Sequence, residues 1–378
     1  MDNDIPYLLL TPGPLTTSRR VREAMMRDYS TWDVDYNSLV NDIRGRLVRL
    51  ASDQEGYTSV LMQGSGTFAV EAVIGSVVPS EGTLLVINNG AYGQRMATIA
   101  ERLGIACVQL QTGETNPPAT ADLDQVLVAH PEVTHVAVVH CETTTGMLNP
   151  VEDIGQVVKD HGCCYIVDAM SSLGGIPLTM EALQADYPVA SANKCVQGVP
   201  GFGFVIARQQ DLQAIQGQAR SLSLDLHDQW QEMESKQGKW RFTSPTHTVC
   251  AFAEALAELE EEGGVPARHQ RYTENQQRLV AGMQEMGFRT LLPAELQSPV
   301  ITAFYDPAPE FDFATFYDLL KQRRFVVYPG KVSLAQTFRI GTIGHVFPED
   351  IDQLLVSISE VLTEMQIDPF ECAGEAMP

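Results

Sequence analysis

The sequence has few basic residues, and this shortage excludes one class of partner. Of its 378 residues, 25 are Lys or Arg and 48 are Asp or Glu, which gives a formal net charge of -23 at pH 7. A surface with this charge repels a phosphate backbone, so we expect no nucleic-acid partner. A local basic pocket for a small anion is compatible with the composition, because a pocket need not follow the net charge.

Long apolar runs and metal-type cysteine spacings are also missing. No apolar run approaches the roughly 20 residues that a bilayer span needs, and Met1–Asp4 lacks the basic and apolar regions of a signal peptide. The seven cysteines are odd in number and contain no C-x-x-C pair. We therefore expect reduced thiols, no bound metal, no membrane partner and a cytoplasmic location.

What the sequence does contain is an alternation of short apolar runs and helical patterns. Between about residues 57 and 210, apolar runs of strand length alternate with amphipathic segments such as 92–103 and 151–161. This alternation predicts an α/β fold, with a mostly parallel sheet covered by helices on both faces. The predicted strands include 59–62, 83–87, 135–140, 165–168, 189–192 and 203–207.

The C-terminal part follows a different pattern. A long helical stretch covers roughly 246–287, with an interruption at Gly263-Gly264-Val265-Pro266. Strands are predicted at 299–305 and 325–328, and helices at 313–322 and after Pro348. We expect a large domain over 21–270 and a smaller α+β domain over 271–378, which the N-terminal segment 1–20 joins.

A glycine-rich turn provides the first candidate for ligand binding. Gln63-Gly64-Ser65-Gly66-Thr67 follows a predicted strand and precedes a predicted helix. Such a turn offers free backbone N–H groups and the positive end of a helix dipole, to which Ser65 and Thr67 add hydroxyl donors. It lacks both the lysine of a P-loop and the three-glycine dinucleotide pattern. The turn therefore suggests a phosphate cradle, although an ordinary strand–helix turn would have the same residues.

Two charged residues follow predicted strands farther along the chain. Asp168 ends the strand 165–168, and ligands of open α/β sheets bind beyond the carboxyl ends of the strands. Lys194 lies between the strand 189–192 and a loop rich in glycine and proline, with few charges around it. A desolvated lysine has a lowered pKa and is a competent Schiff-base nucleophile. A turn-capping carboxylate and a solvated surface lysine are the alternatives.

These motifs together resemble those of the fold-type I pyridoxal-phosphate (PLP) enzymes, and more narrowly the class V aminotransferases. The similarity extends over nearly the whole chain. The stretches that carry it include Gly64-Ser65-Gly66-Thr67, 167–172, 191–194, 8–16, 142–150, 240–247, 328–331 and 338–341. The resemblance implies a large domain with a mostly parallel sheet, a smaller C-terminal domain, and pyridoxal 5'-phosphate as the cofactor.

The resemblance also implies a role for each matching residue. Lys194 would hold the cofactor and move the proton during catalysis, and Asp168 would pair with the pyridinium nitrogen, which keeps the ring an electron sink. The other implied cofactor contacts are Ser65, Gly66, Thr67, Tyr92, Thr143 and Asn193, with Thr243 reaching the cofactor of a second subunit. Shared sites of this kind imply a homodimer.

Arg339 is the candidate for the carboxylate-binding residue. A guanidinium fork matches a carboxylate through two parallel hydrogen bonds, and Arg339 stands in an alternating strand between Phe338 and Ile340. A surface arginine is the alternative. For a second anion, the sequence leaves Arg95, Arg241 and Lys331 open.

The activity that the resemblance implies is the transamination of 2-aminoethylphosphonate with pyruvate, which gives phosphonoacetaldehyde and L-alanine in phosphonate catabolism. An alanine–glyoxylate or serine–pyruvate transaminase would keep the same fold. So would a PLP lyase acting on a hydroxylated aminoethylphosphonate, or a desulfurase. A desulfurase needs a reactive cysteine on a mobile loop, and Cys195 directly beside Lys194 is badly placed for that role. A protein that binds PLP without turnover is the remaining alternative.

Overall fold

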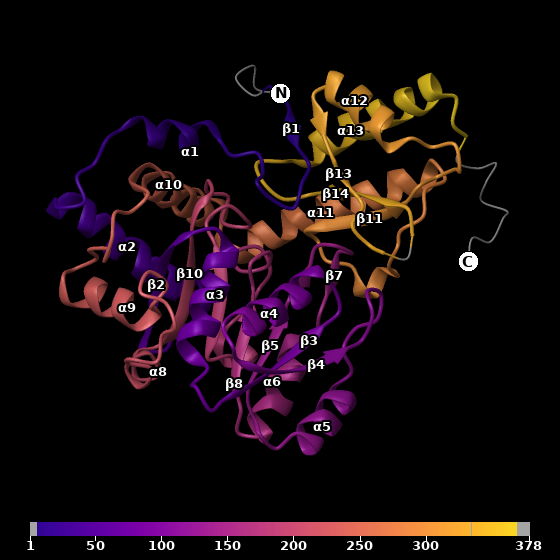
Figure 1. Ribbon diagram of the computed structural model, residues 1–378. Helices are drawn as coiled ribbons and strands as arrows, with labels where there is room; N and C mark the ends of the chain where they lie inside the picture. Colours follow the sequence, from indigo (N-terminus) through magenta and orange to yellow (C-terminus); the bar gives the residue numbers. More distant parts are fainter. Residues whose placement is uncertain (1–5, 334, 369–378) are drawn as a thin grey trace.

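A computed structural model describes residues 6–333 and 335–368. Its central feature is a seven-stranded sheet with the order β2-β10-β9-β8-β5-β3-β4 (Figure 1). Strand β10 is antiparallel to both of its neighbours, and the other pairs are parallel. The strands are β2 Tyr57–Gly64, β3 Thr83–Asn88, β4 Ala106–Gln111, β5 Val133–Val139, β8 Cys164–Asp168, β9 Tyr187–Ser191 and β10 Gly201–Arg208.

The two faces of this sheet are covered by helices because successive strand residues point to opposite sides. In β3, Leu85 and Ile87 belong to one hydrophobic cluster, whereas Leu84 and Val86 belong to the other. The first face packs against α2 Val34–Ala51, α5 Thr120–Ala129, α6 Val151–Asp160 and α10 Thr246–Glu262. The second packs against α3 Gly66–Val77, α4 Ala91–Arg102 and α9 Leu226–Ser235.

Short elements complete this part of the chain. The strands β6 Cys141–Glu142 and β7 Met147–Leu148 form an antiparallel pair just after β5. That pair carries the chain away from the carboxyl end of the sheet and back again before α6. The short helices are α1 Arg19–Glu23, the 3-10 turn η1 Ala24–Met26, α7 Met180–Leu183 and α8 Gln209–Ala214.

The C-terminal residues build a second, smaller sheet with its own core. The order is β11-β14-β13, and both pairs are antiparallel. The elements are α11 Gly264–Glu285, η2 Ala294–Leu296, β11 Ile301–Tyr305, α12 Phe313–Gln322, β12 Phe325–Val326, β13 Tyr328–Pro329, β14 Thr337–Gly341 and α13 Pro348–Met365. Their apolar side chains, with Phe338 among them, form a cluster separate from those of the large sheet.

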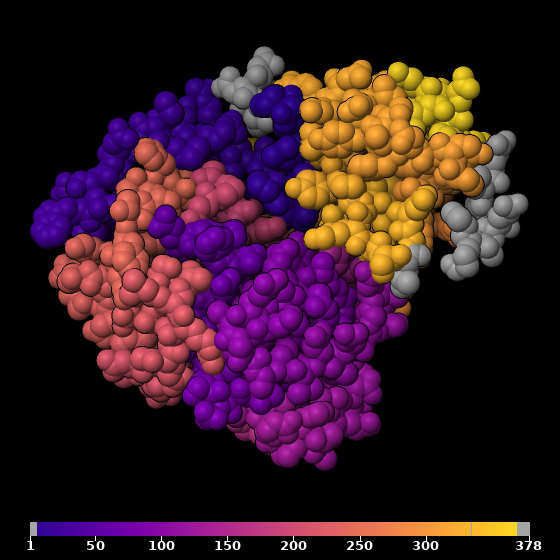
Figure 2. All heavy atoms as spheres, viewed as in Figure 1, coloured from indigo at the N-terminus to yellow at the C-terminus, as the bar shows by residue number. Residues whose placement is uncertain are grey.

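The N-terminal segment joins this smaller part. Strand β1 (Leu8–Leu9) pairs in parallel with β12, and Leu8 and Leu10 belong to the C-terminal cluster. In Figure 2 the indigo N-terminal residues border the orange and yellow C-terminal part. The expected domain limits at residues 20 and 270 stay a prediction, and residues 1–5 and 369–378 of the outer two expected segments lie outside the described residues.

The predicted α/β fold class is confirmed, and the predicted strands and helices occur at the expected places. The helical stretch 246–287 divides at Gly263, as its Gly-Gly-Val-Pro interruption indicated. Strand β4 and the β6–β7 pair were not predicted. Within the described residues, no helix combines the length and the apolar character that crossing a membrane requires.

A substitution of Phe338 tests how far the stability of the C-terminal core depends on one side chain. Its ring is fully buried and lies within 6.2 Å, centroid to centroid, of five other phenylalanine rings. We expect Phe338→Ala to lower the free energy of unfolding by about 3–5 kcal/mol, the range for a buried aromatic. Urea denaturation measures the change. Phe347→Ala is the matched control, because this ring is 38% exposed; equal losses in the two variants would contradict the assigned core.

Candidate active site

A cleft lies at the carboxyl end of the large sheet, where β5, β8 and β9 finish. The space inside it that admits water-sized molecules is about 200 Å³. The residues that line it come from sequence positions far apart: Ser65, Gly66, Thr67, Val70, Tyr92, Arg95, Met96, Val139, Cys141, Asp168, Met170, Ser171, Ser191, Asn193 and Lys194. Most of the predicted cofactor contacts are therefore brought together.

The predicted phosphate cradle is the N-terminus of α3. The helix begins at Gly66, so the N–H groups of its first turn point out of the helix end, where the dipole is positive. Ser65 is the N-cap residue, yet its hydroxyl makes no capping hydrogen bond. The Thr67 hydroxyl accepts a hydrogen bond of 3.1 Å from Arg95. The cradle thus offers backbone N–H groups, hydroxyls and a nearby guanidinium to an anion.

Asp168 ends β8 at the bottom of the cleft. Its carboxylate accepts a hydrogen bond of 3.0 Å from the Met170 N–H, and only 7% of the residue is exposed. Burial raises the pKa of Asp168 to about 6, and the nearby Glu142 carboxylate acts in the same direction. A protonated ring nitrogen placed here would supply the positive partner that a buried carboxylate needs.

Lys194 faces Asp168 from the loop that follows β9, which pairs with β8 in parallel. Its ammonium group donates a hydrogen bond of 2.6 Å to the carbonyl of Pro12 in the N-terminal segment. A side chain at Gly13 would come within 2.9 Å of Lys194 Nζ, so the close approach of this segment requires glycine. Burial lowers the pKa of Lys194, which increases the share of neutral, nucleophilic amine.

The remaining predicted residues form a chain of contacts beside the cleft. Thr143 donates a hydrogen bond of 3.3 Å from its hydroxyl to the Tyr92 hydroxyl. Arg339 is 4% exposed; its Nη1 donates to the carbonyl of Thr143 at 2.7 Å and its Nε to the carbonyl of Pro329 at 3.0 Å. Thr143 and Arg339 do not line the cleft itself, but they are linked to it through Tyr92.

Two candidates lie elsewhere. Thr243 is exposed and does not line the cleft. Arg241 forms an ion pair of 2.9 Å with Asp228 and donates to the carbonyl of Leu222. Of the three residues that the sequence left open for a second anion, Arg241 is therefore already paired outside the cleft, whereas Arg95 and Lys331 both lie against Tyr92.

Glu142 is a site residue that sequence reasoning missed. It is fully buried, and it accepts hydrogen bonds from the N–H of Tyr92 at 3.2 Å and from the Thr144 hydroxyl at 2.6 Å. Its carboxylate thereby caps the start of α4 and fixes the backbone that carries Tyr92. The available signal was an acidic residue following the apolar strand 133–139 and preceding three threonines.

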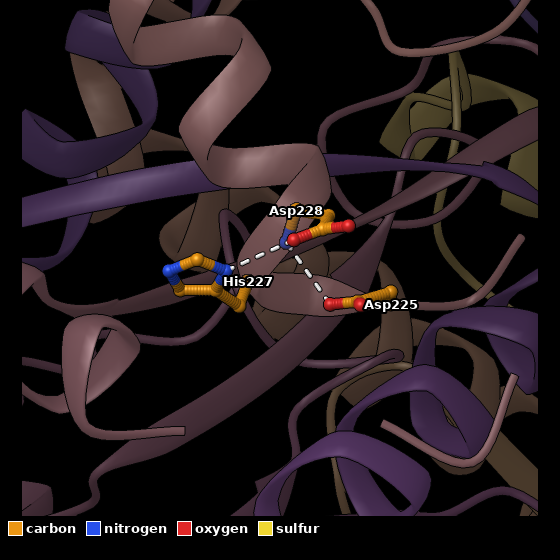
Figure 3. A group of neighbouring side chains, drawn as sticks. All are labelled: Asp225, His227 and Asp228. Atoms are coloured by element: carbon orange, nitrogen blue, oxygen red, sulfur yellow. Dashed lines mark hydrogen bonds and ion pairs between the residues drawn. The ribbon is translucent and has the colours of Figure 1, made fainter. Parts of the chain in front are cut away.

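A second group of carboxylates and a histidine lies away from the cleft (Figure 3). Asp225 caps α9 by accepting a hydrogen bond of 2.9 Å from the Asp228 N–H, and His227 Nδ1 lies 3.1 Å from Asp228 Oδ1. The other carboxylate oxygen of Asp228 pairs with Arg241 at 2.9 Å. The helix cap and the ion pair account for the proximity of these side chains, so we assign no metal to them.

The cleft fits PLP by the chemistry of its donors. An anion cradle, a buried carboxylate and a desolvated lysine match its phosphate, its ring nitrogen and its aldehyde carbon. The Ser191 hydroxyl, which lines the cleft, is buried without a hydrogen-bond partner in the described part of the chain. A polar ligand in the cleft would provide such a partner.

Comparison with known proteins agrees with this geometry. The Bacillus subtilis ureidoglycine–glyoxylate aminotransferase superposes with a TM-score of 0.89 at 24% identity, covering 97% of each chain. The pyridoxamine–pyruvate aminotransferase of Mesorhizobium loti gives a TM-score of 0.88 at 23% identity, covering 99% of this chain and 97% of that one. The fold is that of the fold-type I PLP-dependent aminotransferases.

Sequence similarity narrows the class further. Residues 17–351 match the family described as aminotransferase class-V. The 2-aminoethylphosphonate–pyruvate transaminase of Syntrophobacter fumaroxidans is 61% identical over 358 residues, which cover 94% of this chain and 96% of that protein. The transaminase of the same name from Vibrio vulnificus is 59% identical, covering 94% and 98%. The chain belongs to the class-V aminotransferase family and is an enzyme.

Asp168 allows the site to be tested without substrate. Its folded-state pKa of about 6 lies above the ordinary 3.8, so its ionisation destabilises the cofactor-free fold increasingly as pH rises from about 4 to 6. Above pH 7, burying the ionised Asp168 carboxylate lowers the free energy of unfolding by up to about 3 kcal/mol. We expect cofactor-free Asp168→Asn to be more stable than the wild type at pH 8, with a difference that shrinks toward pH 5.

Urea denaturation of the two cofactor-free proteins at both pH values measures this difference. PLP titration of the same samples serves as the second readout, because the variant loses the charge that pairs with the ring nitrogen and should bind the cofactor more weakly. A variant that is less stable than the wild type at pH 8 would contradict the assigned cost of burying Asp168.

Proposed function

We propose that this enzyme transfers the amino group of 2-aminoethylphosphonate to pyruvate with PLP as cofactor, giving phosphonoacetaldehyde and L-alanine. The observation that carries the proposal is the identity of about 60% over 94% of the chain to transaminases named for these substrates. The arrangement of Lys194, Asp168 and the α3 N-terminus in one cleft supports it. The reaction would belong to phosphonate catabolism.

The cofactor supplies an electron sink when bound, which lets the carbon bearing the amine lose a proton. Ser65, Gly66 and Thr67 would hold the phosphate at the helix N-terminus, with Asn193 beside them. Asp168 would keep the ring nitrogen protonated. The remaining contacts would be Tyr92 stacked on the ring and Thr143 near the phenolic oxygen.

Lys194 is the proposed catalytic base as well as the attachment point. A proton-transfer group works best when its pKa is near the operating pH, and burial lowers the pKa of Lys194 in that direction. The Pro12 carbonyl holds the amine in place by the hydrogen bond of 2.6 Å. This hydrogen bond would keep the free amine within the cleft.

Arg339 is the proposed carboxylate-binding residue for pyruvate and L-alanine. Two of its donor groups bind backbone carbonyls, which fixes the orientation of the guanidinium before any substrate arrives. Its Nη2 edge makes no hydrogen bond with the described residues and is the part available to a carboxylate. A rigid guanidinium loses little side-chain entropy when it binds an anion.

A homodimer with shared active sites fits the exposed position of Thr243. Its neighbour Phe242 is 48% exposed, and Phe68, next to the phosphate cradle, is 50% exposed. Both rings line an apolar hollow with Trp240 and Leu224. A second copy that covers these rings would bring Thr243 toward the partner's cofactor phosphate. We propose this dimer and a cytoplasmic location.

Desulfuration gains no support from the cysteines. That reaction needs a thiolate, and burial raises the pKa of every cysteine in the described residues, that of Cys195 to about 12. Cys195 is also fully buried and donates to the carbonyl of Ser171. It therefore cannot act on a substrate without a large rearrangement of the loop.

A half-reaction without pyruvate tests the proposed substrate. We expect 2-aminoethylphosphonate to convert the cofactor spectrum of the PLP-loaded enzyme to that of its amine form, and pyruvate to reverse the change. L-Serine and L-cysteine, added separately, should react far more slowly. Lys194→Ala is the control for cofactor attachment. Conversion by serine but not by 2-aminoethylphosphonate would retain the family and refute the phosphonate substrate.

A further inference from the structure

Two cationic side chains lie against the ring of Tyr92, and a third is linked to it through Thr143. The guanidinium carbon of Arg95 lies 4.8 Å from the ring centroid, and the ammonium nitrogen of Lys331 lies 5.5 Å from it. Arg339 reaches the same ring through Thr143, whose hydroxyl donates to Tyr92. The three cations lie on α4, in the loop after β13 and on β14. The fold therefore brings positively charged side chains close together in a protein whose net charge is negative.

The three cations form no ion pair with the described residues, although Glu142 attracts Lys331 and Arg339 electrostatically and Asp168 attracts Arg95. Glu142 is the carboxylate that attracts Lys331 electrostatically, but its oxygens already accept hydrogen bonds from Thr144 and from the Tyr92 N–H. Lys331 is an exposed residue, and partial desolvation together with Arg95 and Arg339 lowers the pKa of its ammonium group. Cations that form no ion pair attract an anion.

The three cations differ in how many of their donors are already used. Arg95 donates to Thr67 in the phosphate cradle, which places it on the cofactor side of Tyr92. Arg339 has committed Nε and Nη1 to backbone carbonyls. Lys331 makes no hydrogen bond to any described residue, so all three of its donors are available. Neither the fold nor the proposed cofactor uses the hydrogen-bond donors of Lys331.

The position of Lys331 is nevertheless fixed by its backbone. Tyr328 pairs with Arg339 across β13 and β14. At Gly330, a side-chain carbon would come within 2.0 Å of the Thr337 carbonyl, so only glycine allows the loop to lie this close to β14. This contact holds Lys331 beside the strand that carries Arg339, and its long side chain extends from there to Tyr92.

The two proposed substrates need different amounts of positive charge at different distances. The pyruvate carboxylate is attached directly to the carbon that receives the amine. In 2-aminoethylphosphonate, the anion is one carbon farther away, carries three oxygens and bears up to two charges. One guanidinium edge matches a carboxylate, whereas a phosphonate leaves an oxygen and a charge without a partner at Arg339 alone.

We propose that Lys331 is the residue that recognises the phosphonate, binding the oxygens that Arg339 does not reach. This inference rests on the proposed function and names a specificity-determining residue within it. Lys331 selects the dianionic amine donor, and Arg339 serves both substrates.

The experiment compares two half-reactions in three PLP-loaded variants. Lys331→Met removes the charge, Lys331→Arg keeps it, and Lys321→Met is the matched control, because this exposed lysine of α12 also lies near aromatic rings, those of Tyr7 and Tyr317. The cofactor spectrum is followed against the concentration of 2-aminoethylphosphonate and, separately, of L-alanine. Methylphosphonate is added in a third series as a non-reacting probe of the same group.

We expect Lys331→Met to raise the half-saturating concentration of 2-aminoethylphosphonate by roughly tenfold or more, the loss typical of one charge-assisted hydrogen bond. Inhibition by methylphosphonate should weaken in parallel. The L-alanine half-reaction should change much less, Lys331→Arg should retain most of the wild-type affinity, and Lys321→Met should match the wild type.

Equal losses for both amine donors, or an unchanged response to 2-aminoethylphosphonate in Lys331→Met, would overturn the assignment of Lys331. A wild-type enzyme that reacts with L-alanine but not with 2-aminoethylphosphonate would instead overturn the proposed function. The wild-type series therefore tests the proposed function, and the Lys331→Met series tests the assignment of Lys331.

Discussion

The site depends on one constraint of the sheet: parallel strands that lie side by side finish at the same edge. Strands β8 and β9 are such neighbours, so Asp168 at the end of the first and Lys194 just beyond the second meet in one cleft. The sequence between them cannot place them apart without breaking that pairing. The antiparallel strand β10 then runs back beside β9.

Several charged side chains in and beside the cleft are held without an ion-pair partner among the described residues. Asp168 is buried beside another carboxylate, Lys194 is desolvated, and two cations lie against Tyr92 without forming an ion pair in the described part of the chain. Each of these features costs stability in the free protein. Asp168 matches the ring nitrogen of the proposed cofactor, Lys194 its aldehyde carbon, and the cations an anionic substrate group, so the cost is explained by preorganisation for binding.

Sequence reasoning found the parts of this site that lie at recognisable structural positions. Ser65 to Thr67 open a helix after a strand, and Asp168 and Lys194 follow strands, so periodicity and turn residues located them. It missed Glu142, because an acidic residue after a strand does not by itself show that its carboxylate caps a helix 50 residues away. Nor could it separate Arg95 and Lys331 from Arg241, because that choice depends on the ion pair of Arg241 with Asp228, a side-chain contact that the sequence pattern does not show.

The most direct test of the central claim is to identify the lysine that holds the cofactor. The PLP-loaded enzyme is reduced with borohydride, which fixes the cofactor on that residue, then digested and analysed by mass spectrometry. We predict that the modified peptide contains Lys194 and that no other lysine carries the cofactor in comparable yield. Cofactor found on a different lysine, or on none, would contradict the account of how the two strand ends build the site.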